Sequence, residues 1–138
     1  MSYDFRLRVY YEDTDAGGIV YYANYLKFAE RARSEALIAL GISQQAMLET
    51  HGIGFAVRRV SVDYLAPARL EDQLLVTTQV GEIGGGRIEL GQAVWRDATC
   101  LAKIRVLLVC FGRSGRAVRI PAAVREAIGR LPPLDEAP

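Results

Sequence analysis

The sequence has little of the chemistry that marks several classes of protein. Its 138 residues contain one histidine, two cysteines and one tryptophan. Cys100 and Cys110 share no CxxC spacing and lie in stretches with the pattern of strands, so the sequence predicts core thiols rather than a disulfide. No spacing typical of metal ligands is present, and we expect neither a metal nor a resident cofactor.

Excess charge and long apolar runs are also missing. The formal net charge is +1, which gives no electrostatic argument for a nucleic-acid partner. No apolar run reaches the length of a membrane span, and the first residues, Met1 to Arg6, have no apolar signal core. We therefore expect a cytoplasmic protein without stable membrane insertion. Because 51% of the residues are hydrophobic, the chain can build a core, and its length suits one domain over residues 1–138.

The hydrophobic pattern predicts an α+β domain. Apolar and polar residues alternate from Phe5 to Glu12, which is typical of a half-buried strand. From Tyr21 to Leu40 apolar residues recur every three or four positions, which predicts a long helix that Gly41 ends. Four more strands are expected over residues 55–65, 73–81, 87–96 and 101–111. The last of them is so apolar that we expect a central strand covered on both faces.

Shorter segments complete the expected fold. Ser43 is placed to cap a short helix over residues 44–49. Pro121 suits the first position of a terminal helix that reaches about residue 130. Residues 131–138 are expected to form a loose tail. One antiparallel sheet with the long helix on one face leaves its other face and its edges open, and a homo-oligomer is the economical way to cover them.

The stretch from Tyr11 to Tyr25 joins the first strand to the long helix and concentrates functional groups. It contains the aspartates of an Asp13-Thr14-Asp15 turn, followed by Gly17 and Gly18, which let the backbone take positive φ. The same stretch holds four tyrosines, namely Tyr11, Tyr21, Tyr22 and Tyr25. An Asp-x-Asp pair alone is usually an Asx turn and a helix cap, so the spacing by itself assigns no chemistry.

The longer context of this turn resembles a known family. Residues 9–21 (VYYEDTDAGGIVY), with Tyr25 and with the Glu30–Arg33 stretch, resemble the opening motif of the hot-dog-fold acyl-CoA thioesterases. The branch is that of 4-hydroxybenzoyl-CoA thioesterase and the Tol-Pal-associated acyl-CoA thioesterase. Residues 62–72 resemble a second motif of the family. The resemblance implies the hot-dog fold, in which a five-stranded antiparallel sheet wraps around a long central helix, and a dimer or tetramer of such units.

The resemblance also implies an activity. It predicts hydrolysis of a short- or medium-chain acyl-CoA, or of an aroyl-CoA, to the free acid and CoA. Asp15 would be the nucleophile or the general base, and Asp13, Gly17 and Gly18 would shape the loop. Because a helix N-terminus offers unpaired N–H groups, we expect the backbone N–H groups of Tyr21 and Tyr22 to receive the oxyanion.

One position departs from part of the family. The residue after Tyr21 is usually histidine in the Tol-Pal branch and is Tyr22 here, as in the hydroxybenzoyl branch. The only histidine, His51, lies outside both motifs. For the substrate itself, cationic side chains should meet the CoA phosphates. The residues proposed to bind substrate or CoA are Tyr25, Arg59, Arg69, Arg87 and Arg105.

Two other functions stay open at the level of the sequence. The Tol-Pal resemblance implies a role in lipid metabolism and contact with acyl carrier protein, so the chain could act as a weakly catalytic binding partner of that protein or of phospholipid-synthesis enzymes. A dehydratase on the same fold would need a histidine-containing dyad, and no histidine lies in the turn.

Overall fold

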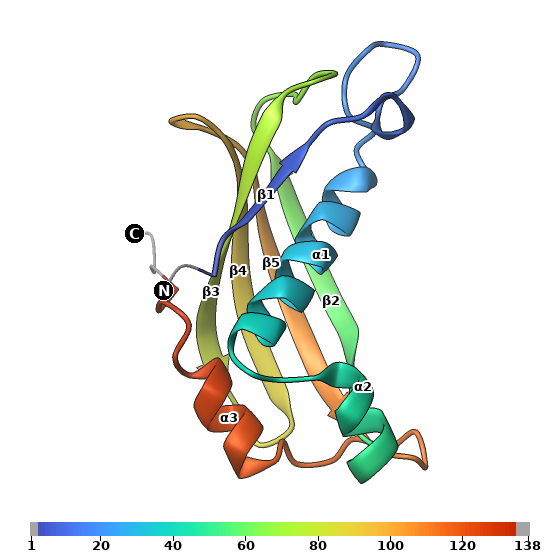
Figure 1. The fold of residues 1–138 in the computed structure, drawn as a ribbon, viewed down its shortest axis with the longest axis vertical. Helices are drawn as coiled ribbons and strands as arrows, with labels where there is room; N and C mark the ends of the chain where they lie inside the picture. The colour runs from blue at the N-terminus through green and yellow to red at the C-terminus, as the bar shows by residue number, and fades with distance from the viewer. Residues whose placement is uncertain (1–2, 135–138) are drawn as a thin grey trace.

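The computed structural model describes residues 3–134 as one curved sheet around a long helix (Figure 1). The strands are β1 (Phe5–Arg8), β2 (Gly54–Tyr64), β3 (Gln73–Ile83), β4 (Arg87–Arg96) and β5 (Thr99–Phe111). The helices are α1 (Asn24–Ala39), α2 (Gln44–Ala46) and α3 (Ala122–Ile128), with a 3-10 turn at Tyr11–Asp13 and a π-helical turn at Met47–His51. All strand pairs are antiparallel, in the order β1-β3-β4-β5-β2. The predicted α+β class and five-stranded antiparallel sheet are confirmed.

The core lies between α1 and the concave face of the sheet. On β3, Leu74, Val76, Thr78 and Val80 all face inward, as their alternation predicts. The buried stripe of α1 is rich in alanine and includes Ala29, Ala32 and Ala36, together with Tyr25 and Phe28. These small side chains let the helix lie close to the sheet.

A buried polar junction fixes α1 against the sheet. Gln92 on β4 is 3% exposed and donates to the Ala29 carbonyl at 2.9 Å and to Thr78 Oγ1 at 3.1 Å. Its Oε1 accepts a hydrogen bond from Arg33 Nη1 at 3.0 Å. The pKa of Arg33 lies below the usual arginine value, because the effect of burial outweighs the opposing effect of the Glu30 carboxylate. Because each buried polar atom has a partner, the junction orients the helix without leaving an unpaired group in the core.

A β-bulge in β2 decides which way the second half of that strand faces. Val57 is opposite Leu108 and Arg59 is opposite Leu107, so Arg58 is the extra residue. Beyond such a bulge every side chain changes face. The bulge therefore turns Arg59 outward and Tyr64, which is opposite the buried Ala102, toward α1.

Several predicted boundaries need correction. The long helix begins at Asn24 rather than Tyr21, because the three residues before it belong to the turn. Ser43 caps the second helix as predicted, by accepting from the Ala46 N–H, but from Met47 on the helix winds as a π-helical turn rather than an α-helix. Pro121 is the N-cap of α3, with ψ of 143°, and not its first helical residue. Gly41, with φ of 84°, ends α1 as predicted.

Two further expectations are wrong. The strand β5 is covered on one face only within this chain, because Lys103 and Arg105 are exposed on the other. Residues 131–134 are not a loose tail: Leu131 is 4% exposed, the Val80 N–H donates to the Pro132 carbonyl, and the Leu134 N–H donates to the Val80 carbonyl. Residues 135–138 of the predicted tail lie outside the described residues.

Candidate active site

The loop between β1 and α1 is a small closed turn. Thr14 pairs with Val20 in an antiparallel bridge. Inside this bridge the Asp15 N–H donates to the Ile19 carbonyl at 2.9 Å, and the Gly18 N–H donates to the Asp15 carbonyl at 3.1 Å. Gly18 has φ of 80°, a value at which a side chain is strained. The backbone of the loop is therefore held by its own hydrogen bonds.

The carboxylate of Asp15 is held at one oxygen and open at the other. Its Oδ1 accepts a hydrogen bond from the Gly17 N–H at 2.8 Å, which forms an Asx turn. Its Oδ2 has no hydrogen-bond partner among residues 3–134, and the side chain is exposed. Gly17 is needed for close approach rather than for positive φ, because a Cβ there would lie 3.2 Å from Asp15 Oδ1. Asp15 thus presents one fixed, accessible carboxylate oxygen.

Asp13 joins the turn to the start of α1. Its Oδ2 accepts a hydrogen bond from the Tyr10 N–H at 2.8 Å. Its carbonyl accepts two more, from the Tyr21 N–H at 2.9 Å and from Asn24 Nδ2 at 2.9 Å. These three bonds tie together the chain before the turn, the chain after it and the first residue of α1.

The two predicted oxyanion donors differ. The Tyr21 N–H is already bonded to the Asp13 carbonyl, so the prediction that it is a free donor is wrong. The Tyr22 N–H has no partner among the described residues. The carbonyl groups on both sides of it are held, since the Tyr21 carbonyl accepts from the Asn24 N–H at 2.8 Å and the Tyr22 carbonyl accepts from Tyr64 Oη at 2.9 Å. The Tyr22 N–H is therefore an unpaired donor with a fixed direction.

Most of the second sequence motif forms the loop between β2 and β3, residues 65–72, which packs over the turn and is called the closing loop below. The Val20 N–H donates to the Ala68 carbonyl at 2.9 Å, and Ile19 forms an antiparallel bridge with Arg69. The Ala68 N–H in turn donates to Tyr25 Oη at 3.0 Å. Tyr25 is 3% exposed, so within this chain it is a core residue that supports the loop, and the expectation that it meets substrate is wrong.

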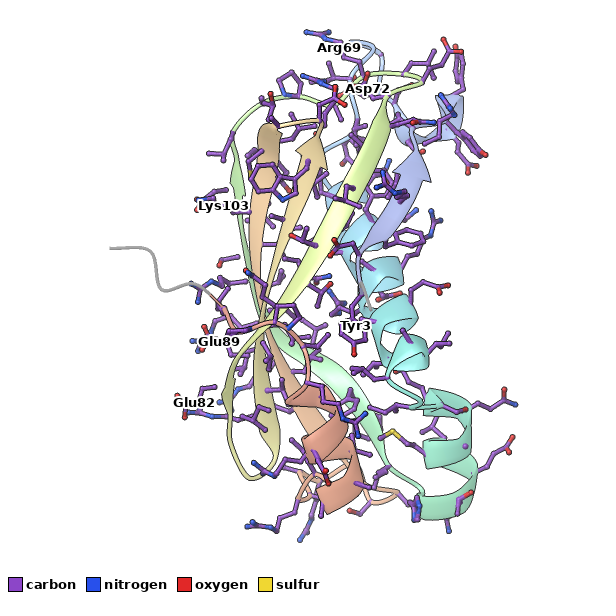
Figure 2. All side chains as sticks on the ribbon, turned by 60° about the vertical axis from the view of Figure 1, so that its left-hand side comes forward. Tyr3, Arg69, Asp72, Glu82, Glu89 and Lys103 are labelled. Atoms are coloured by element: carbon purple, nitrogen blue, oxygen red, sulfur yellow. The ribbon has the colours of Figure 1, made fainter. Side chains whose placement is uncertain are left out.

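An ion pair between Arg96 and Asp72 fixes the closing loop. Arg96 Nη1 donates to Asp72 Oδ2 at 2.7 Å and to the Pro67 carbonyl at 3.1 Å, while the Arg69 N–H donates to the same Asp72 oxygen at 2.8 Å. Burial raises the pKa of Asp72, but the Arg69 N–H and the Arg96 guanidinium outweigh burial and leave the pKa below its usual value. Arg69 and Asp72 lie together at the turn end of the molecule (Figure 2).

The four predicted CoA-binding arginines do not form one cluster. Arg59, Arg87 and Arg105 line a groove of about 310 Å³ with Glu82 and Glu89. Figure 2 shows Glu82, Glu89 and Lys103 on the sheet face turned away from α1, whereas Arg69 lies at the end that carries the turn. In the groove Arg105 pairs with Glu89 at 2.6 Å and Arg87 with Glu82 at 3.8 Å. Only Arg69 of the four lies beside the turn within this chain.

Sequence reasoning missed three residues that shape the site. Asn24 bonds to the turn through its side chain, Tyr64 holds the Tyr22 carbonyl, and Arg96 holds the closing loop. Tyr64 lies within the second motif, so that motif contained a signal for it, whereas Asn24 stands between the matched residues of the first motif, next to Tyr25. Arg96 lies outside both motifs, and no local pattern marks it.

Comparison with known proteins finds relatives of this chain in both sequence and structure. The family model described as the thioesterase superfamily matches residues 17–102. An acyl-CoA thioesterase, YbgC, of Haemophilus influenzae is 42% identical over 132 residues, which cover 94% of this chain and 96% of that protein. A probable thioesterase from Bartonella henselae has a similar structure, with a TM-score of 0.82, 31% identity and coverage of 86% of this chain and 98% of that one. A gentisyl-coenzyme A thioesterase also superposes, with a TM-score of 0.84, 26% identity and coverage of 91% and 98%.

The single antiparallel sheet around α1, with a carboxylate turn at the start of that helix, defines a hot-dog-fold thioesterase. The chain belongs to the thioesterase superfamily, and the predicted enzyme class, a thioester hydrolase, is confirmed. No helix within residues 3–134 combines the length and the apolar character that crossing a bilayer would need.

Proposed function

We propose that this protein hydrolyses acyl-CoA or aroyl-CoA thioesters, with Asp15 as the catalytic carboxylate and the Tyr22 N–H as the oxyanion donor. The observation that carries the proposal is that the same segment between β1 and α1 holds both an Asp15 carboxylate oxygen without a partner and an unpaired, fixed Tyr22 N–H. A thioester carbonyl needs a nucleophile or base and a donor for the developing negative charge. The names of the relatives support CoA thioesters as the substrate class.

The Asp15 oxygen can act in two ways. Direct attack on the thioester carbonyl forms an acyl-enzyme anhydride and releases the CoA thiolate, and water then hydrolyses the anhydride. Alternatively, the carboxylate takes a proton from a water molecule as that water attacks. Repeated turnover in H₂¹⁸O tests for direct attack: ¹⁸O in the Asp15 carboxylate identifies the anhydride, because water that opens it at the aspartyl carbonyl leaves its oxygen on Asp15, whereas base catalysis puts none there.

Arg69 is the residue that we assign to a CoA phosphate. It is exposed, its side chain makes no hydrogen bond or salt bridge within residues 3–134, and its backbone is bonded to the turn. The substitution Arg69→Ala is expected to raise KM for acyl-CoA about fivefold and to leave kcat unchanged, because a phosphate contact binds ground state and transition state alike. Arg59→Ala, on the outer face, is the matched control. Equal effects of the two substitutions would contradict the assignment.

The proposal is tested by measuring thiol release from a panel of thioesters. The panel holds short and medium acyl-CoAs, benzoyl-CoA and hydroxylated aroyl-CoAs, and an acyl chain on acyl carrier protein, the partner that the family resemblance implies. Turnover of at least one CoA thioester well above the rate in buffer is the expected result. Binding of acyl carrier protein without turnover of any thioester would instead favour a role as a binding partner.

We also propose that the working unit is a homo-oligomer. The edge strand β2 exposes Val57 and Val60, at 46% and 39%, along eleven residues that pair on one side only. The other edge, β1, has four residues and carries two exposed arginines. A long edge strand with exposed apolar side chains on its inner face is unusual unless another strand covers it, and a second copy meets that need.

A further inference from the structure

The hydroxyl of Tyr64 makes one polar contact that bears on the proposed site. Tyr64 is the last residue of β2, 42 positions from Tyr22 in the sequence, and its Oη donates to the Tyr22 carbonyl at 2.9 Å. This carbonyl belongs to the same residue as the N–H that we propose as the oxyanion donor. Within residues 3–134 no other donor to it is present.

The ring of Tyr64 is held independently of its hydroxyl. It packs edge-on against the ring of Tyr25, with centroids 5.4 Å apart, and against the ring of Tyr22, with centroids 6.3 Å apart. Tyr25 is itself fixed, because it is buried and its hydroxyl accepts from the Ala68 N–H. The position of the Tyr64 hydroxyl is thus set by the core, and a Phe at this position would keep the ring contacts.

The hydroxyl remains a donor under ordinary conditions. Burial first, and then the neighbouring Tyr22 and Tyr25, raise the pKa of Tyr64 above the usual tyrosine value. It therefore stays protonated throughout the neutral range. The bulge at Arg58 is what brings it to this side of the sheet, since without the extra residue Tyr64 would face away from α1.

We propose that Tyr64 is a positioning residue, which acts through the Tyr22 carbonyl to fix the direction of the Tyr22 N–H donor. The inference rests on the proposed function of that N–H. Tyr64 touches no reacting atom in this role. Its hydrogen bond, together with the Asn24 N–H on the Tyr21 carbonyl, holds both peptide planes that flank Tyr22. Preorganised donors stabilise an oxyanion because they need no rearrangement when the charge develops.

The test compares Tyr64→Phe with wild type and with Tyr3→Phe. Tyr3 is a half-buried tyrosine beside the middle of α1, away from the turn end marked by Arg69 (Figure 2). We expect Tyr64→Phe to lower kcat about tenfold, less than the hundredfold or more that loss of an oxyanion donor costs. We expect KM to change less than twofold, and we expect the melting temperature of Tyr64→Phe to equal that of Tyr3→Phe. An unchanged kcat, or a raised KM at constant kcat, would overturn the inference.

A second readout does not depend on turnover. The ¹⁵N order parameter of the Tyr22 amide should be about 0.85 in wild type and in Tyr3→Phe, as in rigid backbone, and clearly lower in Tyr64→Phe. An equal order parameter in all three proteins would refute the positioning role even if the wild type hydrolysed no thioester. If instead the amide loosens in Tyr64→Phe while no thioester is hydrolysed by wild type, the contact positions Tyr22 but the proposed function fails, and with it the catalytic meaning of the inference.

Discussion

At the scale of single residues, the turn depends on what each glycine allows. Gly17 has no side chain to push away the Asp15 carboxylate, and Gly18 supplies the left-handed backbone that closes the loop. The two roles are separable, because a Cβ at Gly18 would meet nothing within 4 Å and would act through backbone strain alone. The chemistry that we propose for Asp15 therefore rests on a backbone conformation as well as on a carboxylate.

This dependence gives a prediction with a matched control. Gly18 and Gly41 have φ of 80° and 84°, and neither has an atom within 4 Å of an added Cβ. Each change to alanine is expected to cost about 1 kcal/mol in unfolding free energy, the usual cost of a left-handed non-glycine residue. Only Gly18→Ala is expected to lower kcat, because only that residue lies in the turn that carries the proposed catalytic Asp15. Urea unfolding and thiol release measure the two effects, and equal kcat losses would refute the distinction.

At the scale of elements, the closing loop between β2 and β3 is what holds the turn in place. Its backbone meets the turn at Ala68 and Arg69, and its far end is fixed by the pair of Asp72 and Arg96. The second sequence motif is therefore a structural clamp on the first. This explains why a stretch without an obvious catalytic group resembles the family as the turn does.

The clamp predicts a dependence of stability on pH. The pKa of Asp72 is lowered in the folded protein, so its contribution to stability is full above the ordinary aspartate pKa of about 3.9 and is lost as the pH falls through the folded value. Asp72→Asn is expected to lower the unfolding free energy by about 1 kcal/mol at pH 7 and by less as the pH drops below about 4. Asp63→Asn, which removes an exposed aspartate, is the control. A deficit that stayed constant down to pH 2 would contradict this account.

At the scale of the whole molecule, the sheet has one long uncovered edge among the described residues. The strand β2 lies at the right-hand side of Figure 1, with no strand beyond it. A second copy that pairs there would extend the sheet and cover Val57 and Val60. The outer face, with its paired arginines and glutamates, needs no such cover.

The edge gives a prediction about assembly. Wild type is expected to have the mass of two or more chains in light scattering. Val60→Lys is expected to shift the population toward one chain, because Val60 is opposite the buried Val106 and a charge that points to this inner face of an edge strand opposes pairing. Ser61→Lys, which places the same charge on the outer face of the same strand, is the control and is expected to keep the wild-type mass. A wild-type monomer at micromolar concentration would contradict the proposal.

Much of this fold follows from local patterns in the sequence. The inward residues of β3, the stop at Gly41 and the cap at Ser43 depend on short-range spacing, and the structure confirms them. The bulge at Arg58 was not predictable, because the loose alternation of that strand fits more than one register. The bond between the Tyr21 N–H and the Asp13 carbonyl, and the packing of Leu131, join segments whose proximity only the folded chain determines.

The measurement that bears most directly on the central proposal is the kcat of Asp15→Asn. Asparagine keeps the Oδ1 acceptor for the Gly17 N–H, so the Asx turn and the melting temperature should persist while the carboxylate proposed to react is removed. Asp13→Asn, which likewise keeps an acceptor for the Tyr10 N–H, is the control. We expect a loss in kcat of at least about a hundredfold for Asp15→Asn and of less than about fivefold for Asp13→Asn. Undiminished turnover by a folded Asp15→Asn protein would contradict the proposal.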